Sequence, residues 1–95
     1  MQAPEIRALR NRLELTQQAF ASLLGLSFVS VNRWEQGHST PTGLSLVLLQ
    51  LVANALDRSS PAEVARQLRE VGPDPLAIIR TLVHLEGDAH APRRP

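Results

Sequence analysis

The 95-residue sequence contains no cysteine, no lysine and no tyrosine, and its aromatic residues are two phenylalanines and one tryptophan. The absence of cysteine excludes disulfides and thiolate metal sites, and it is compatible with a reducing compartment. No apolar run is long enough to cross a bilayer, and the first residues lack the apolar segment of a signal peptide. We therefore expect a soluble, cytoplasmic protein with no membrane partner.

All ten basic residues are arginine, and nine acidic residues leave a formal net charge of +1. This balance neither favours nor excludes a nucleic acid as partner, so only the local placement of the arginines can decide. A chain of this length has room for one small domain with a modest core.

Apolar residues recur at helical spacing along the chain, and no segment alternates with period two. The pattern predicts six helices and no strand. Three of them are helices 4–13, 44–56 and 75–86. The second helix is capped by Thr16 and ends at Gly25, the third is capped by Ser27 and ends at Gly37, and the fifth starts in a capping box at Ser60 and ends near Gly72. Helix 44–56 is apolar around nearly its whole circumference, which predicts that it is the central element of the core.

A helix-turn-helix requires two short helices that cross closely, a tight turn between them and one buried position on the second helix. Within residues 17–36, Ala21 is small enough for a close crossing, and Gly25 can enter left-handed backbone space without penalty. Val31 lies at the offset of the buried position. The three requirements are met together, which indicates a helix-turn-helix.

The segment LTQQAFASLLGLSFVSVNRWEQG, residues 15–37, resembles the helix-turn-helix of the Xre/Cro-like regulators, which include lambda-type repressors, Cro proteins and HigA-type antitoxins. The motif runs from Thr16 to Gly37, and the resemblance covers about residues 5–56. It implies an all-α, lambda-repressor-like helix-turn-helix bundle, here with additional C-terminal helices, that binds double-stranded DNA.

The resemblance also implies roles for individual residues. Base reading falls on the first exposed positions of the second helix of the motif, which are Phe28, Val29, Asn32 and Arg33. Arg33 suits a bidentate contact to guanine, and Asn32 suits adenine or a phosphate. Gln17 matches a glutamine that binds a DNA phosphate, aided by the exposed amides at the start of its helix. The other residues expected to contact phosphates are Thr16, Ser27, Ser30, Gln36, His38 and Thr40.

Phe28 and Val29 depart from the polar residues that many members of the family carry at these positions. The apolar groups exposed in the major groove are thymine methyls, so the pair predicts apolar readout of a step that contains thymine. The alternative is that Phe28 folds back onto the loop or the first helix. Val31 and Trp34 belong to the core side of the same helix, with Trp34 expected to pack on helix 44–56.

Glu35 matches a glutamate that pairs with an arginine of the first helix in the family, and Arg10 occupies the matching position. Such an ion pair is structural, because removal of one partner would leave a partly buried charge unpaired.

Enzymatic functions find no support in the sequence. The three histidines, His38, His84 and His90, lack the spacing of metal ligands. No glycine-rich phosphate loop and no pair of nucleophile and base is present. We expect no catalysis, no metal and no cofactor.

The favoured function is that of a sequence-specific transcriptional regulator, a homodimeric repressor that reads a palindromic operator. One module contacts only a few base pairs, and two modules in successive major grooves distinguish the operator from other DNA sequences much better than one. We expect helix 75–86 to form the dimer interface, since it is apolar on two sides, and the alternative is that it lies wholly inside the core of the monomer. The interface residues would be Ile78, Ile79, Leu82, Val83 and Leu85. Residues 1–56 would then be the DNA-binding core, 57–87 the C-terminal helices that complete the core and form the interface, and 88–95 a disordered tail.

Two alternatives stay open. The protein could be an antitoxin that binds a toxin protein and autoregulates its operon. It could also be a structural module whose helix-turn-helix has lost DNA binding, which the low net charge suggests.

Overall fold

The computed structural model describes the backbone of residues 1–90 and the side chains of residues 1–86, and this part of the chain forms six helices and no strand. The helices are α1 (Ala3–Arg12), α2 (Gln17–Leu24), α3 (Phe28–Glu35), α4 (Gly43–Arg58), α5 (Pro61–Val71) and α6 (Pro75–His90). The predicted all-α class is confirmed. None of the described helices is long and apolar enough to span a membrane.

Helix α6 differs most from its prediction, because it continues to His90, four residues beyond the expected end at Glu86. The expected disordered tail, 88–95, therefore begins inside this helix. Residues 91–95 of that tail lie outside the described residues.

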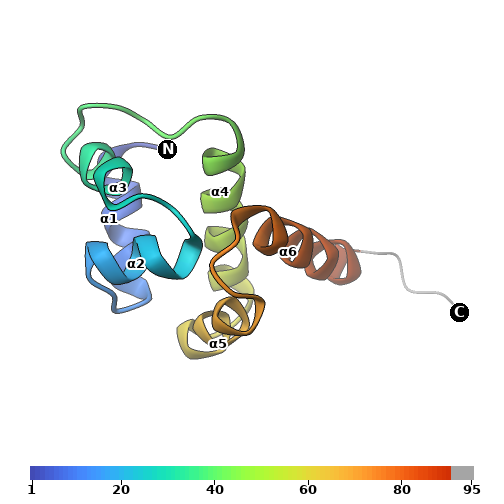
Figure 1. Ribbon diagram of the computed structural model, residues 1–95. Coiled ribbons are helices and arrows are strands. Elements are labelled where there is room, and N and C mark those ends of the chain that lie inside the picture. The colour runs from blue at the N-terminus through green and yellow to red at the C-terminus, as the bar shows by residue number, and fades with distance from the viewer. Residues whose placement is uncertain (91–95) are drawn as a thin grey trace, which may run out of the picture.

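Helix α4 runs through the middle of the molecule. In Figure 1, α1, α2 and α3 lie on one side of it, α6 extends from the other side, and α5 lies near its C-terminal end. Its buried residues are Leu48, Leu49, Leu51, Val52, Ala55 and Leu56. Helix α4 is thus the central element that its apolar circumference predicted.

The other helices each bury one face in the same core. The buried residues are Ile6 and Leu9 of α1, Phe20, Ala21 and Leu24 of α2, Val31 and Trp34 of α3, Val64, Ala65 and Leu68 of α5, and Ile78 and Leu82 of α6. Because α5 and α6 contribute to this cluster, residues 61–86 belong to the same core as the helix-turn-helix.

One face of α6 lies against α4. The Glu86 carboxylate accepts a hydrogen bond from Asn54 at 3.2 Å and lies 3.8 Å from the guanidinium of Arg58, and both partners are on α4. Ile78 and Leu82, which precede Glu86 by two turns and one turn, are 0% and 2% exposed. The prediction that Ile78 and Leu82 form a dimer interface is therefore wrong, because they face the core of their own chain.

The start of α5 contains half of the capping box that the sequence predicted. The Ser60 hydroxyl accepts a hydrogen bond from the Glu63 amide at 3.2 Å. The Glu63 carboxylate does not return to the Ser60 amide but pairs with Arg66 one turn further along α5. An i, i+3 ion pair has taken the place of the second capping bond.

Candidate nucleic-acid interface

Helices α2 and α3 are placed by three local features of the sequence. The Thr16 hydroxyl accepts a hydrogen bond from the Ala19 amide at 3.1 Å, and the Ser27 hydroxyl accepts one from the Ser30 amide at 2.9 Å, so each helix has the predicted N-cap. Gly25 ends α2 in the left-handed conformation, with φ of 71°. The turn between the helices is therefore as short as a helix-turn-helix requires.

Lack of space also requires glycine at position 25. A Cβ at this position would lie 2.4 Å from the carbonyl oxygen of Pro73 and 2.7 Å from the ring of Pro75. The α5–α6 connection therefore lies directly against the turn between α2 and α3. Backbone conformation and space both exclude a side chain there.

A polar network connects α1, α2 and α3 behind the solvent-facing side of α3. Arg10 binds the Glu35 carboxylate through two bonds, Nε to Oε2 at 2.7 Å and Nη2 to Oε1 at 2.9 Å. The Gln17 amide donates to Glu35 Oε1 at 3.1 Å and accepts from Asn32 Nδ2 at 3.0 Å. The ion pair that the resemblance implied is present, and it anchors α3 on the two preceding helices.

The charges in this network support each other. Burial of the Glu35 carboxylate favours its neutral form, but the hydrogen bonds from Arg10 and Gln17, together with the charges of Arg10 and Arg7, outweigh this and lower the pKa of Glu35. The hydrogen bond to Glu35 is also the main reason why the pKa of Arg10 is raised. Both partners are therefore charged at neutral pH.

Arg7 belongs to the same network, although it is not among the site residues predicted from sequence. Its guanidinium donates to the backbone carbonyl of Glu35, at the C-terminal end of α3. A cation at this end also complements the helix dipole. The available signal was the spacing of Arg7 and Arg10, which lie one turn apart on the same side of α1.

The opposite side of α3 faces solvent. Phe28 is 41% and Val29 65% exposed, so both side chains reach solvent. Base reading by this pair and the alternative contact of Phe28 with the loop or the first helix both stay predictions. Arg33 is exposed, and its guanidinium makes no hydrogen bond or ion pair with any group in the described part of the chain. Val31 and Trp34 are buried on the core side, as predicted. Helix α3 thus presents two apolar groups and one uncommitted guanidinium to the outside.

Asn32 lies between these two sides. It is partly buried and donates to Gln17, so one of its amide hydrogens is already in use. Its role in base reading stays a prediction, and any contact to DNA would have to share the amide with Gln17.

The residues expected to bind phosphates lie at the start of α2, at the start of α3 and in the loop after α3. Thr16, Ser27, Gln36, His38 and Thr40 are exposed, and Gln17 and Ser30 are partly buried. Ser27 donates its hydroxyl to Ser30 at 2.9 Å, and Gln17 is held by Glu35 and Asn32. Their contacts to phosphate stay predictions. No cluster of metal-binding side chains occurs among the residues whose side chains the structure describes.

Comparison with known proteins places this arrangement in a family. The helix-turn-helix family matches residues 6–64. The chain is 47% identical over 47 residues to the HTH-type transcriptional regulator DicA of Escherichia coli strain K12 and 40% identical over 48 residues to Antitoxin HigA-2 of Vibrio cholerae. It is 45% identical over 47 residues to the Type II methyltransferase M.SsoII of Shigella sonnei.

These likenesses are partial on both sides. The alignment with DicA covers 50% of this chain and 35% of DicA, and the alignment with HigA-2 covers 50% of this chain and 46% of HigA-2. The alignment with M.SsoII covers 46% of this chain and 12% of that protein. The chain thus aligns with less than half the length of each of these relatives. No solved structure matches the chain significantly.

Proposed function

The chain belongs to the helix-turn-helix family of Xre/Cro-like regulators, and on this premise we propose that it is a transcriptional repressor that inserts α3 into the major groove of double-stranded DNA. The observation that carries the proposal is the division of α3 into an anchored side and an exposed side. Glu35 fixes the helix to α1 and α2, while Phe28, Val29 and Arg33 reach solvent. A recognition helix requires this combination of a rigid base and free side chains.

Base reading in this proposal has an apolar part and a charged part. Phe28 and Val29 lie at the start of α3 and would contact thymine methyl groups. Arg33 lies further along α3, one turn and a residue beyond Phe28, and its unpaired guanidinium can bind O6 and N7 of guanine. Asn32 would read adenine or bind a phosphate while it keeps its bond to Gln17.

Phosphate contacts would flank α3 on both sides. On one side, the amides at the start of α2 and the second amide hydrogen of Gln17 would bind a phosphate. On the other side, the exposed loop residues Gln36, His38 and Thr40 can donate hydrogen bonds. These contacts would position α3 without adding sequence information.

The proposed repressor acts as a homodimer on a palindromic operator, with half-sites about 34 Å apart. The surface that supports dimerisation is an apolar strip on α6 made of Leu76, Ile79 and Val83, of which Ile79 is partly buried and the others are exposed. Leu85 lies on the opposite side of α6, beside Leu82 and Arg58. This strip keeps Ile79 and Val83 from the interface predicted from sequence, whereas Ile78 and Leu82 are buried in the core of their own chain. Exposed apolar groups on one helix are typical of a surface that a second copy covers.

Selection of bound duplexes from a random pool by the purified protein tests the proposal. The expected result is a palindrome whose half-sites contain a thymine-bearing step and a guanine, with two chains bound to each duplex. Recovery of duplexes without a shared motif, with an affinity that does not fall as salt rises, would contradict DNA recognition by α3.

A second candidate function is that of an antitoxin that also regulates its own operon. It is favoured by the 40% identity over 48 residues to Antitoxin HigA-2. Expression of the chain together with the product of an adjacent gene tests it. Rescue of growth that depends on a stable complex of the two proteins supports the antitoxin function, and growth arrest unaffected by the chain contradicts it.

A further inference from the structure

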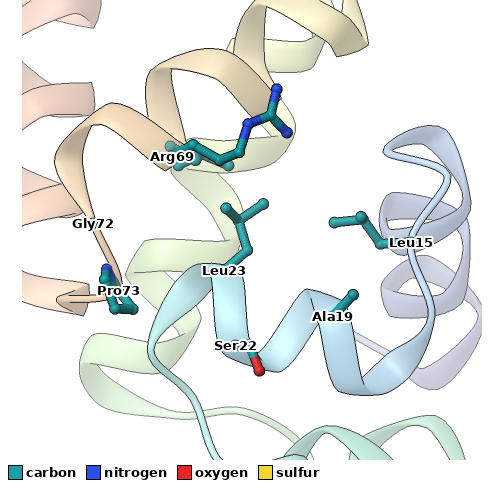
Figure 2. Close-up of a pocket in the computed structure, with 8 residues that line it drawn as sticks. Leu15, Ala19, Ser22, Leu23, Arg69, Gly72 and Pro73 are labelled. Atoms are coloured by element: carbon teal, nitrogen blue, oxygen red, sulfur yellow. The ribbon is translucent and has the colours of Figure 1, made fainter.

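An apolar groove lies between α2 and α5, on the side of the molecule away from α3. It has a volume of about 400 Å³ and is open to solvent along one side. Figure 2 shows Leu15 and Leu23 turned toward the space between the two helices, with Arg69 reaching over it from α5. The residues that line it are Leu15, Ala19, Ser22, Leu23, Leu68, Arg69, Gly72 and Pro73.

The groove is separate from the proposed base-reading side of α3. Gln17 marks the side of α2 that faces α3, because it bonds to Asn32. At about 100° per residue, Ser22 and Leu23 are turned by about 120° or more from Gln17 around the helix axis. A partner in the groove would therefore leave the exposed side of α3 free.

The far wall of the groove is held in place. Pro73 lies so close to Gly25 that a Cβ there would be 2.4 Å from the Pro73 carbonyl oxygen. The wall thus packs against the turn of the helix-turn-helix, which limits its movement toward Gly25. A preformed groove binds its partner at a lower cost in conformational entropy than one that must be ordered first.

The charge at the mouth of the groove is positive and uncommitted. Arg66, one turn earlier on α5, pairs with Glu63 and Glu70. Arg69 is exposed and makes no ion pair with any residue in the described range 1–86. An apolar floor beside a free guanidinium is complementary to apolar side chains that have a carboxylate next to them.

We propose that this groove binds an amphipathic helix of a partner protein, with apolar anchors between α2 and α5 and a carboxylate on Arg69. The open shape suits the side chains of a helix better than an enclosed small molecule, which ligand sites normally surround on most sides. The partner could bind while α3 is on DNA, so the repressor would carry a second protein to its operator.

Titration of the isotope-labelled full chain with a bridged helical peptide, followed by NMR, tests the proposal. The peptide has leucines at i, i+4 and i+7 and one glutamate beside them, and a matched peptide has lysine in place of the glutamate. The expected amide shifts are confined to the groove, at Ala19, Leu23, Arg69 and Gly72. The lysine peptide should bind at least about fivefold more weakly, and Arg69→Glu should reverse this preference.

Two tryptophan variants provide the structural control. Ala19→Trp, at a partly buried position that Figure 2 shows turned toward Leu15, fills the groove and should abolish the shifts, while Ala62→Trp, on an exposed part of α5 outside the groove, should preserve them. Equal binding of the two peptides, or shifts on α4 and α6 instead of the groove, would overturn the proposal. Groove shifts that grow with protein concentration in the absence of peptide would assign the groove to self-association and would also overturn it.

Discussion

Replacement of Glu35 by glutamine should destabilise the fold more than any exposed charge substitution. The Glu35 side chain is 3% exposed and the Arg10 side chain 17%, and the variant would place a neutral amide against the two donors of Arg10. Removal of one partner from a buried ion pair costs about 3–5 kcal/mol. Since Arg10 keeps some contact with water, we expect a loss of about 3 kcal/mol in the free energy of unfolding. That loss is large against the roughly 5–15 kcal/mol of a typical domain.

The pH dependence of this loss has a defined sign. The folded chain lowers the pKa of Glu35, so its contribution to stability is fully present above the unfolded pKa of about 4.3. The contribution is lost as the pH falls through the lowered pKa of the folded state. The difference in stability between the natural chain and Glu35→Gln should therefore be largest near neutral pH and should shrink in acid.

Urea unfolding measured by the fluorescence of Trp34 provides the assay, because Trp34 is the single tryptophan, is buried and precedes Glu35 on α3. The control is Asp57→Asn, which removes an exposed pair with Arg12 at 3.2 Å and should cost less than about 1 kcal/mol. If Glu35→Gln costs no more than the control, or if the difference between the natural chain and Glu35→Gln is the same at neutral and acid pH, the structural role of the network is refuted.

Four further predictions concern single positions. Arg33→Ala should reduce operator affinity by about 1–3 kcal/mol with an unchanged circular dichroism spectrum, and unchanged affinity would remove Arg33 from base reading. Gly25→Ala should lower the free energy of unfolding by at least about 1 kcal/mol, because φ is 71° and its Cβ would meet the backbone of Pro73; a neutral effect in urea unfolding would contradict this close approach. Val83→Glu should yield a folded monomer in sedimentation, since Val83 is half exposed, whereas a persistent dimer would place the interface elsewhere. Ser60→Ala should cost about 1 kcal/mol through loss of the α5 cap, measured by urea unfolding, and no loss would show that the cap bond contributes little.

The helices and their ends could be predicted because local chemistry determines them. Thr16 and Ser27 cap helices with their own hydroxyls, and Gly25 ends α2 because it tolerates positive φ. Such signals act within a few residues and can be read along the chain. The loop between α1 and α2 shows the limit, since Glu14 adopts φ of 57° there although glutamate gives no sign of a left-handed turn.

Contacts between distant residues could be predicted only through the family resemblance. Gln17 looks like an exposed polar residue in the sequence, but the crossing of α2 on α3 brings it between Asn32 and Glu35. The side of α6 that faces the core is equally undetermined by the sequence, because the helix is apolar on two sides and either of them could be buried. The sequence therefore predicts Ile78 at an interface, while the structure buries it in the core of its own chain.

The solvent-facing apolar pair on α3 follows from the geometry of that helix. Val31 and Trp34 already occupy the side that the core covers, and Glu35 is held there by Arg10. Phe28 and Val29 lie on the first turn, where rotation of α3 to bury them would break the Glu35 ion pair and expose Trp34. The chain thus leaves Phe28 and Val29 in water, at an unfavourable hydration free energy that grows with their exposed apolar area. Contact with apolar groups of a partner would recover this free energy, and on double-stranded DNA the thymine methyls of the major groove are the groups available to do so.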